Sequence, residues 1–150
     1  MNSVTWKEFE ASAPELAQFG SERLNGLVTY LGTIRKNGLP RLHPVTPIIG
    51  EGHLYLFMEP TSPKGKDLER GSAYVLHSTV ADNDGSNGEF QLTGYASRVH
   101  DAKARKQAAS LGALELEARY ILFELGIVES RSTVYRDDVP VHRRWKVSVP

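Results

Sequence analysis

The amino-acid sequence predicts a mainly-β domain, a closed or partly closed antiparallel barrel with a few helices at its periphery. Six or so short stretches rich in β-branched and aromatic residues alternate with tight-turn signals, which is typical of such barrels. Helical periodicity is confined to the start of the chain and to two short later segments. Several strands are apolar on both faces, so helices or a second subunit should cover part of the barrel exterior.

The first segment, about residues 5–24, is predicted to be helical because apolar residues recur there at three- and four-residue steps. Ser12 and Glu15 have the spacing of a capping box, and Pro14 fits a first helical turn. We therefore expect two short helices that meet near Ser12. Asn25 and Gly26 should end the second one.

Three strands are predicted next, over residues 27–34, 41–49 and 53–58. Asn37-Gly38 is a strong signal for a type I′ hairpin turn, in which both central residues have positive φ. Gly50-Glu51-Gly52 should make the second turn. The three strands are therefore expected to form a meander.

The remaining elements follow from turn and capping signals. A loop entering a short helix is expected over 61–70, and Asp101 and Gly112 bracket a helix predicted over 102–111. Further strands are predicted over 73–80, 89–99, 117–135 and 141–147.

Composition narrows the function classes. The chain has 150 residues, which suits a single domain spanning 1–150. Basic and acidic residues balance at 18 each, without the basic excess of a nucleic-acid binder. No cysteine is present, which excludes disulfides, thiol nucleophiles and thiolate metal sites. We find no signal peptide and no apolar run of the roughly 20 residues that a membrane span needs, so a cytoplasmic protein is predicted.

The stretch from Phe57 to Leu68 carries the clearest chemical signal. A strand ends there, a loop supplies Ser62 and Lys64, and a helix containing Lys66 begins. Unpaired backbone N–H groups at a helix start favour anions, and the hydroxyl and ammonium groups add donors and charge. These groups suit a phosphate monoester, although an ordinary helix cap with solvated lysines shows the same pattern.

A second stretch, Gly38 to Pro47, has two prolines three residues apart, Pro44 and Pro47, which interrupt the middle of a predicted strand. Because proline cannot donate to a ladder, this strand should lie at a sheet edge or a bulge. Its free backbone groups could pair with a flat heteroaromatic ring, or the prolines could simply protect the edge from aggregation. The expected second hairpin brings Val45 near Phe57 and His43 near Glu59, so the strand edge and the anion loop would line one site.

The order of these motifs resembles a known family. Gly-x-Pro-x-x-His-Pro-Val (Gly38–Val45), Tyr-Leu-Phe (Tyr55–Phe57), Ser-x-Lys-x-x-x-Leu (Ser62–Leu68) and Glu-x-x-x-x-Gly-x-Ala (Glu89–Ala96) occur in this order. This is similar to the FMN-binding split barrel of the pyridoxamine 5′-phosphate oxidase superfamily, over roughly residues 27–99. The resemblance implies a six-stranded antiparallel split β-barrel of the Greek-key type, with FMN at the interface of a homodimer.

The resemblance also implies roles for individual residues. Ser62 and Lys64 would hold the phosphate, helped by Lys66, while His43 stands where the family has an arginine. Arg41 points the same way along the strand and could compensate. The resemblance places Pro44, Val45 and Thr46 along the edge of the isoalloxazine ring. It places Phe57 and Met58 where they would close the pocket at the end of the third strand. Trp145 is similar to a C-terminal tryptophan that approaches the flavin in some members.

The implied activity is that of an oxidoreductase working by flavin hydride transfer on an unidentified small molecule. The C-terminal arginines that bind substrate in the true oxidase have no convincing counterpart, which argues against pyridoxamine phosphate as substrate. No acid, base or nucleophile is evident, and the histidines show no metal-ligand spacing. Three alternatives remain open: the deazaflavin F420 as cofactor, a non-enzymatic flavin or haem sensor or storage protein, and an interaction module without a cofactor.

Overall fold

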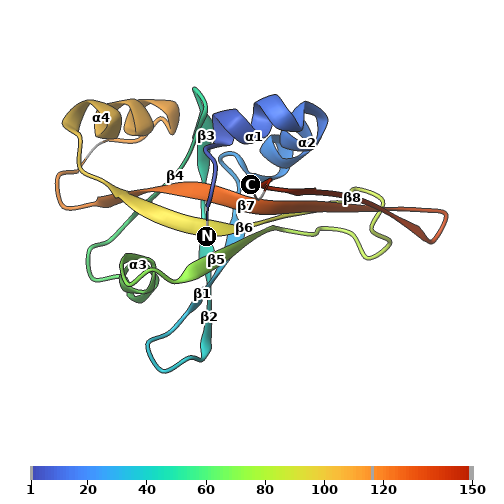
Figure 1. Ribbon diagram of the computed structural model, residues 1–150, viewed down its shortest axis with the longest axis horizontal. Coiled ribbons are helices and arrows are strands. Elements are labelled where there is room, and N and C mark those ends of the chain that lie inside the picture. Colours follow the sequence, from blue (N-terminus) through green and yellow to red (C-terminus); the bar gives the residue numbers. More distant parts are fainter. Residues whose placement is uncertain (1, 116, 149–150) are drawn as a thin grey trace.

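The computed structural model describes residues 2–115 and 117–148 and has one antiparallel sheet with four helices around it (Figure 1). The strands follow the order β2-β1-β5-β6-β7-β4-β3, and β8 pairs with β7. Their bounds are β1 (Thr29–Ile34), β2 (Pro40–Val45), β3 (Ile48–Gly50), β4 (His53–Met58), β5 (Ala73–Ser78), β6 (Glu89–Val99), β7 (Ile121–Arg136) and β8 (Val139–Lys146). The helices are α1 (Trp6–Ser12), α2 (Pro14–Leu24), α3 (Pro63–Glu69) and α4 (Ala102–Leu111). The prediction of a mainly-β split barrel with peripheral helices is confirmed.

The described residues form eight strands, one more than the seven predicted ranges, because the strand predicted over 41–49 divides at Thr46-Pro47. The count of six implied by the resemblance is too low. The first half of the divided strand, β2, pairs with β1, and its second half, β3, pairs with β4. These two halves stand at opposite ends of the strand order although only two residues join them. The sheet must therefore curl back on itself, yet β2 and β3 do not pair with each other, so the barrel stays open.

The two N-terminal helices meet at Ala13, beside Ser12, but their caps differ from the prediction. The capping box is formed by Thr5 and Glu8 at the start of α1. α2 begins at Pro14 without any side-chain cap. The Ser12 hydroxyl is used elsewhere, because it accepts a hydrogen bond from the indole of Trp145 at 2.9 Å.

The type I′ geometry predicted for the first turn occurs at the second turn instead. Asn37-Gly38 is not a type I′ turn, because only Gly38 has positive φ, at 87°. Arg35 N–H donates to Leu39 O at 2.8 Å, which leaves a three-residue loop at the tip of the β1–β2 hairpin. Glu51 and Gly52 both have positive φ, at 52° and 82°, so the type I′ geometry occurs between β3 and β4 instead.

The core explains why β4 is apolar on both faces. Leu54, Leu56 and Met58 join the main cluster, which α1, α2 and α3 complete. Tyr55 packs on the opposite face against Ala108 of α4, so a helix covers this part of the barrel exterior. In Figure 1, α4 lies above the long β6–β7 ribbon, whereas α3 and the β1–β2 hairpin lie below it. None of the helices within the described ranges is long and apolar enough to cross a membrane.

Candidate functional site

The loop between β4 and α3 joins a buried hydroxyl to a desolvated ammonium. Ser62 occupies the N-cap position of α3 and is only 7% exposed, yet its side chain makes no capping hydrogen bond. Its Oγ instead accepts a hydrogen bond from Lys64 Nζ at 3.0 Å. Burial lowers the pKa of Lys64, because the surrounding protein replaces part of its hydration. The pair therefore differs from the alternative of a helix cap with a solvated lysine, and it offers two adjacent donors to an anion.

Helix α3 itself contributes little to this site. It has seven residues, Pro63–Glu69, and Pro63 has no N–H to offer. The side chains of Ser62 and Lys64 therefore provide most of the positive potential there.

Arg41 and Lys66 lie on the other side of Pro63, around a buried carboxylate. Asp67 is 1% exposed and accepts hydrogen bonds from Arg41 Nε at 2.8 Å, Arg70 Nη2 at 2.7 Å and Thr33 Oγ1 at 2.8 Å. Burial acts to raise the pKa of Asp67, but the donors from Arg41, Arg70 and Thr33 outweigh it and hold that pKa below its usual value. Arg41 is thus partly engaged by Asp67, a contact that no local sequence pattern indicates.

The proline-bearing strand β2 has a free edge, as expected. β2 is the last strand of the sheet on its side. Because Arg35 and Leu39 form a hydrogen-bonded pair, Pro40, Leu42 and Pro44 occupy the alternate positions, whose backbone groups face away from β1. Leu42 is the residue among these three that has an N–H. The edge therefore presents one donor between two proline carbonyls.

The side chains of Arg41, His43 and Val45 lie on one face of β2, because their positions alternate with those of Pro40, Leu42 and Pro44. Val45 packs against the main core. His43 is exposed, and its Nδ1 lies 2.8 Å from the carbonyl of Pro44. Thr46 follows the strand and is exposed.

The prediction that a hairpin places Val45 near Phe57 and His43 near Glu59 is wrong. Val45 pairs with Thr29 and His43 pairs with Leu31, so neither lies opposite β4 in the sheet. The strand breaks at Thr46-Pro47, and only Ile48–Gly50 continues into the hairpin with β4. β2 and α3 meet nevertheless, because Arg41 reaches Asp67.

Phe57 and Met58 line a mainly apolar pocket of about 350 Å³ at the end of β4. Phe57 packs near α4, whereas Met58 is buried in the main core and its sulfur lies close to Gly65 of α3. Ala109 and Leu114 complete the apolar wall. Glu59, at the start of the loop that carries Ser62, also lines this pocket.

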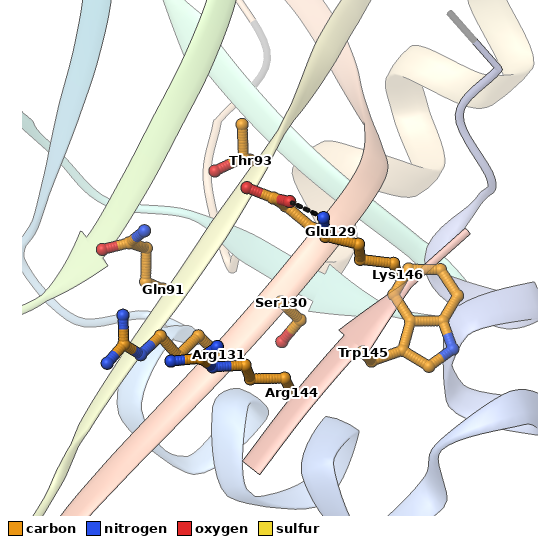
Figure 2. Close-up of a pocket in the computed structure, with 8 residues that line it drawn as sticks. All are labelled: Gln91, Thr93, Glu129, Ser130, Arg131, Arg144, Trp145 and Lys146. Carbon is orange, nitrogen blue, oxygen red and sulfur yellow. Dashed lines mark ion pairs between the residues drawn. The ribbon is translucent and has the colours of Figure 1, made fainter. Parts of the chain in front are cut away.

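Trp145 lies in a different part of the chain's surface, in the pocket of about 220 Å³ that Figure 2 shows. Its ring packs on Phe9, with centroids 5.0 Å apart, and its N–H is bonded to Ser12. The same pocket holds Arg131 and Arg144 on paired positions of β7 and β8. Within one chain, Ser62 and Lys64 are not among the residues that line it.

Sequence reasoning missed a basic cleft of about 510 Å³ between the β1–β2 turn and α3. Its cationic side chains are those of Arg35, Lys36, Arg41, Lys66 and Arg70. These residues come from three separated segments, and no sequence motif links them. The one available signal is the three-and-four-residue spacing of Lys66 and Arg70 with Pro63, which places them on one helical face.

Comparison with known proteins agrees with this architecture. No family model matches the sequence, and no curated protein matches it. Among solved structures, a protein related to general stress protein 26 of Bacillus subtilis, from Clostridium acetobutylicum and described as of the pyridoxinephosphate oxidase family, is similar over 94% of this chain and 96% of its own, with a TM-score of 0.62 and 17% identity. The fold is the split barrel of the pyridoxamine phosphate oxidase-like proteins.

Two further split barrels show how varied the ligands of similar structures are. An F420 reductase matches with a TM-score of 0.56 and 14% identity, over 73% of this chain and 94% of its own. HutZ, the haem storage protein from Vibrio cholerae, matches with a TM-score of 0.55 and 15% identity, over 77% of this chain and 89% of its own. At such identities the likeness establishes the fold alone.

Proposed function

We propose that this chain is a cytoplasmic, homodimeric flavoprotein that binds FMN and acts as an oxidoreductase on an unidentified small molecule. The observation that carries the proposal is the pair of Ser62 and Lys64, a buried hydroxyl bonded to a desolvated ammonium at 3.0 Å. An ammonium without full hydration gains more from an anion than a solvated one does. A phosphate monoester matches this donor set.

The free edge of β2 is consistent with a planar ring bound beside that phosphate. Leu42 N–H and the flanking proline carbonyls supply a donor and acceptors along one line. Isoalloxazine carries complementary groups on its pyrimidine edge. A bound flavin would supply hydride transfer at N5, while the chain's own groups would bind and orient it.

The homodimer is supported by exposed apolar side chains on the outer face of β1 and β2. Tyr30, Ile34 and Leu42 share that face and are 40%, 47% and 69% exposed. Large apolar residues gathered on one sheet face are typical of a surface that another chain covers. A partner seated there would also enclose the open strand edge.

The deazaflavin F420 is the second candidate cofactor. Its longer acidic tail needs more positive charge near the phosphate than FMN does. The basic cleft beside α3 supplies this charge.

Lys64→Ala tests the proposed phosphate clamp. Loss of a charge-assisted hydrogen bond should weaken FMN binding by about 1–3 kcal/mol, which fluorescence titration of the purified protein measures. Lys103→Ala is the matched control, because Lys103 is an exposed lysine on α4. An unchanged affinity for Lys64→Ala would remove this residue from the site.

A steady-state assay of flavin reduction by reduced nicotinamides distinguishes an enzyme from a sensor, a storage protein or a module without a cofactor. A bound flavin that turns over supports the oxidoreductase. A flavin that stays bound without turnover indicates a sensor or storage protein, and a spectrum without flavin after incubation with FMN indicates a module without this cofactor.

A further inference from the structure

The pocket of about 350 Å³ at the end of β4 combines apolar walls with an acidic rim. Its walls are formed by the side chains of Phe57, Met58, Ala109 and Leu114. Among the described residues that line the pocket, the charged ones are Glu59 and Glu115, and none is basic. Both glutamates occupy exposed positions. A molecule in this pocket would therefore meet hydrocarbon along the walls and carboxylates where the pocket opens to water.

Hydrogen bonds within the chain hold the walls of this pocket in place. Leu114 N–H donates to Ala109 O at 2.9 Å, which ties the segment after α4 back to that helix. At the other end of the same segment, Arg105 Nη2 donates to the carbonyl of Tyr120, another lining residue, at 2.7 Å. Leu114 is nevertheless 51% exposed, whereas Ala109 is buried. A leucine fixed at the edge of an apolar pocket gives a ligand contact area without the cost of ordering the chain.

The guanidinium of Arg119 shows that the rim can hold an organic cation. It lies over the ring of Tyr120, 4.7 Å from the centroid, and its Nη2 is 3.2 Å from Glu59 Oε1. Its Nε donates to Glu117 at 2.9 Å. An aromatic face beside a carboxylate attracts organic cations in general. Because the Arg119 side chain is 55% exposed, an incoming cation can replace it on Glu59 at a small energetic cost.

We propose that this pocket binds a small apolar cation, an amine or a positively charged nitrogen heterocycle with a hydrocarbon or aromatic body. The body would pack on Phe57 and Leu114, and the positive group would lie near Tyr120 and the two lining glutamates. The same carboxylates would repel an anion, and a neutral molecule of equal shape would gain from the apolar walls alone. The described residues that line the pocket do not include the proposed phosphate clamp. The inference therefore goes beyond the proposed flavin binding and does not depend on it.

Three probes that differ mainly in charge test the proposal: phenylbutylamine, phenylbutanol and phenylbutanoate, each titrated calorimetrically into the purified full-length chain at neutral pH. The wild type should bind the amine about three- to tenfold more tightly than the alcohol, and the carboxylate most weakly. The difference between amine and alcohol should shrink as salt rises. Equal affinity for the amine and the alcohol, tighter binding of the carboxylate, or no binding of the amine would overturn the proposal.

Two variants test whether the amine binds at this rim. Glu115→Gln removes one lining carboxylate and should weaken amine binding by about two- to fivefold. Arg119→Gln removes the resident cation from Glu59 and Tyr120 and should strengthen amine binding by a similar factor, while alcohol binding stays within about twofold in both variants. Glu10→Gln, at an exposed site of α1, is the charge-matched control and should leave amine binding unchanged. An amine affinity that neither falls in the first variant nor rises in the second would overturn the assignment to this pocket.

Discussion

Asp67 shows how one buried charge can determine the geometry around a candidate site. Its carboxylate joins Thr33 of β1, Arg41 of β2 and Arg70 at the end of α3. Both arginines remain partly exposed, with 28% and 38% of their side chains accessible. Removing the carboxylate therefore leaves cations that water can still reach, which costs less than stranding a fully buried charge.

Asp67→Asn should lower the free energy of unfolding by about 2–3 kcal/mol at pH 7, the range for hydrogen bonds to a charged group. Because the pKa of Asp67 is held below its usual value, its contribution is complete above the unfolded value of about 4 and is lost as the pH falls through the folded value. Urea unfolding of both proteins across this range should show the stability gap narrowing below about pH 4. A gap that is the same at pH 3 and pH 7 would contradict the assigned network.

At the scale of elements, the turns account for most of the differences between expectation and structure. Asn37-Gly38 has the residues of a type I′ turn, but the β1–β2 hairpin closes one residue wider at Arg35 and Leu39. Glu51 takes a left-handed φ of 52° without the usual turn residue at that position. Hairpin geometry follows from register, and register is set by tertiary packing as well as by local sequence.

Glu51→Gly should stabilise the protein by about 0.5–1 kcal/mol, because glycine adopts positive φ without a steric cost. Thermal unfolding measures this as a raised midpoint. Glu10→Gly, at an exposed site in α1 with ordinary helical φ, is the control and should destabilise by a similar amount. If both variants are destabilised, the turn at Glu51 is not strained.

Much of the element pattern could be predicted from the sequence, since it depends on local signals. The two N-terminal helices, α4 between Asp101 and Gly112, and the long strands β6 and β7 lie close to their expected bounds. The break at Thr46-Pro47 was not predicted, because the apolar pattern runs on through it. The pairing of each half depends on partners distant in sequence. The Asp67 network and the basic cleft escaped prediction for the same reason.

On the scale of the whole molecule, the open barrel brings β2 close to α3 and the loop before it, although no hairpin joins them. β1 places β2 at the sheet edge, α3 packs beneath β1 and β6, and Arg41 spans the gap to Asp67. The anion loop and the free edge are thus attached to one rigid sheet. Trp145 lies apart from them in the single chain, on β8 beside α1.

The most direct measurement compares FMN with riboflavin, which differ only in the phosphate, by calorimetric titration of the wild type and Lys64→Ala. If Ser62 and Lys64 clamp a phosphate, the wild type should prefer FMN by about tenfold or more, the worth of one charge-assisted contact. Lys64→Ala should lose most of that preference while its riboflavin affinity stays the same. Equal affinity of the wild type for FMN and riboflavin would contradict the account.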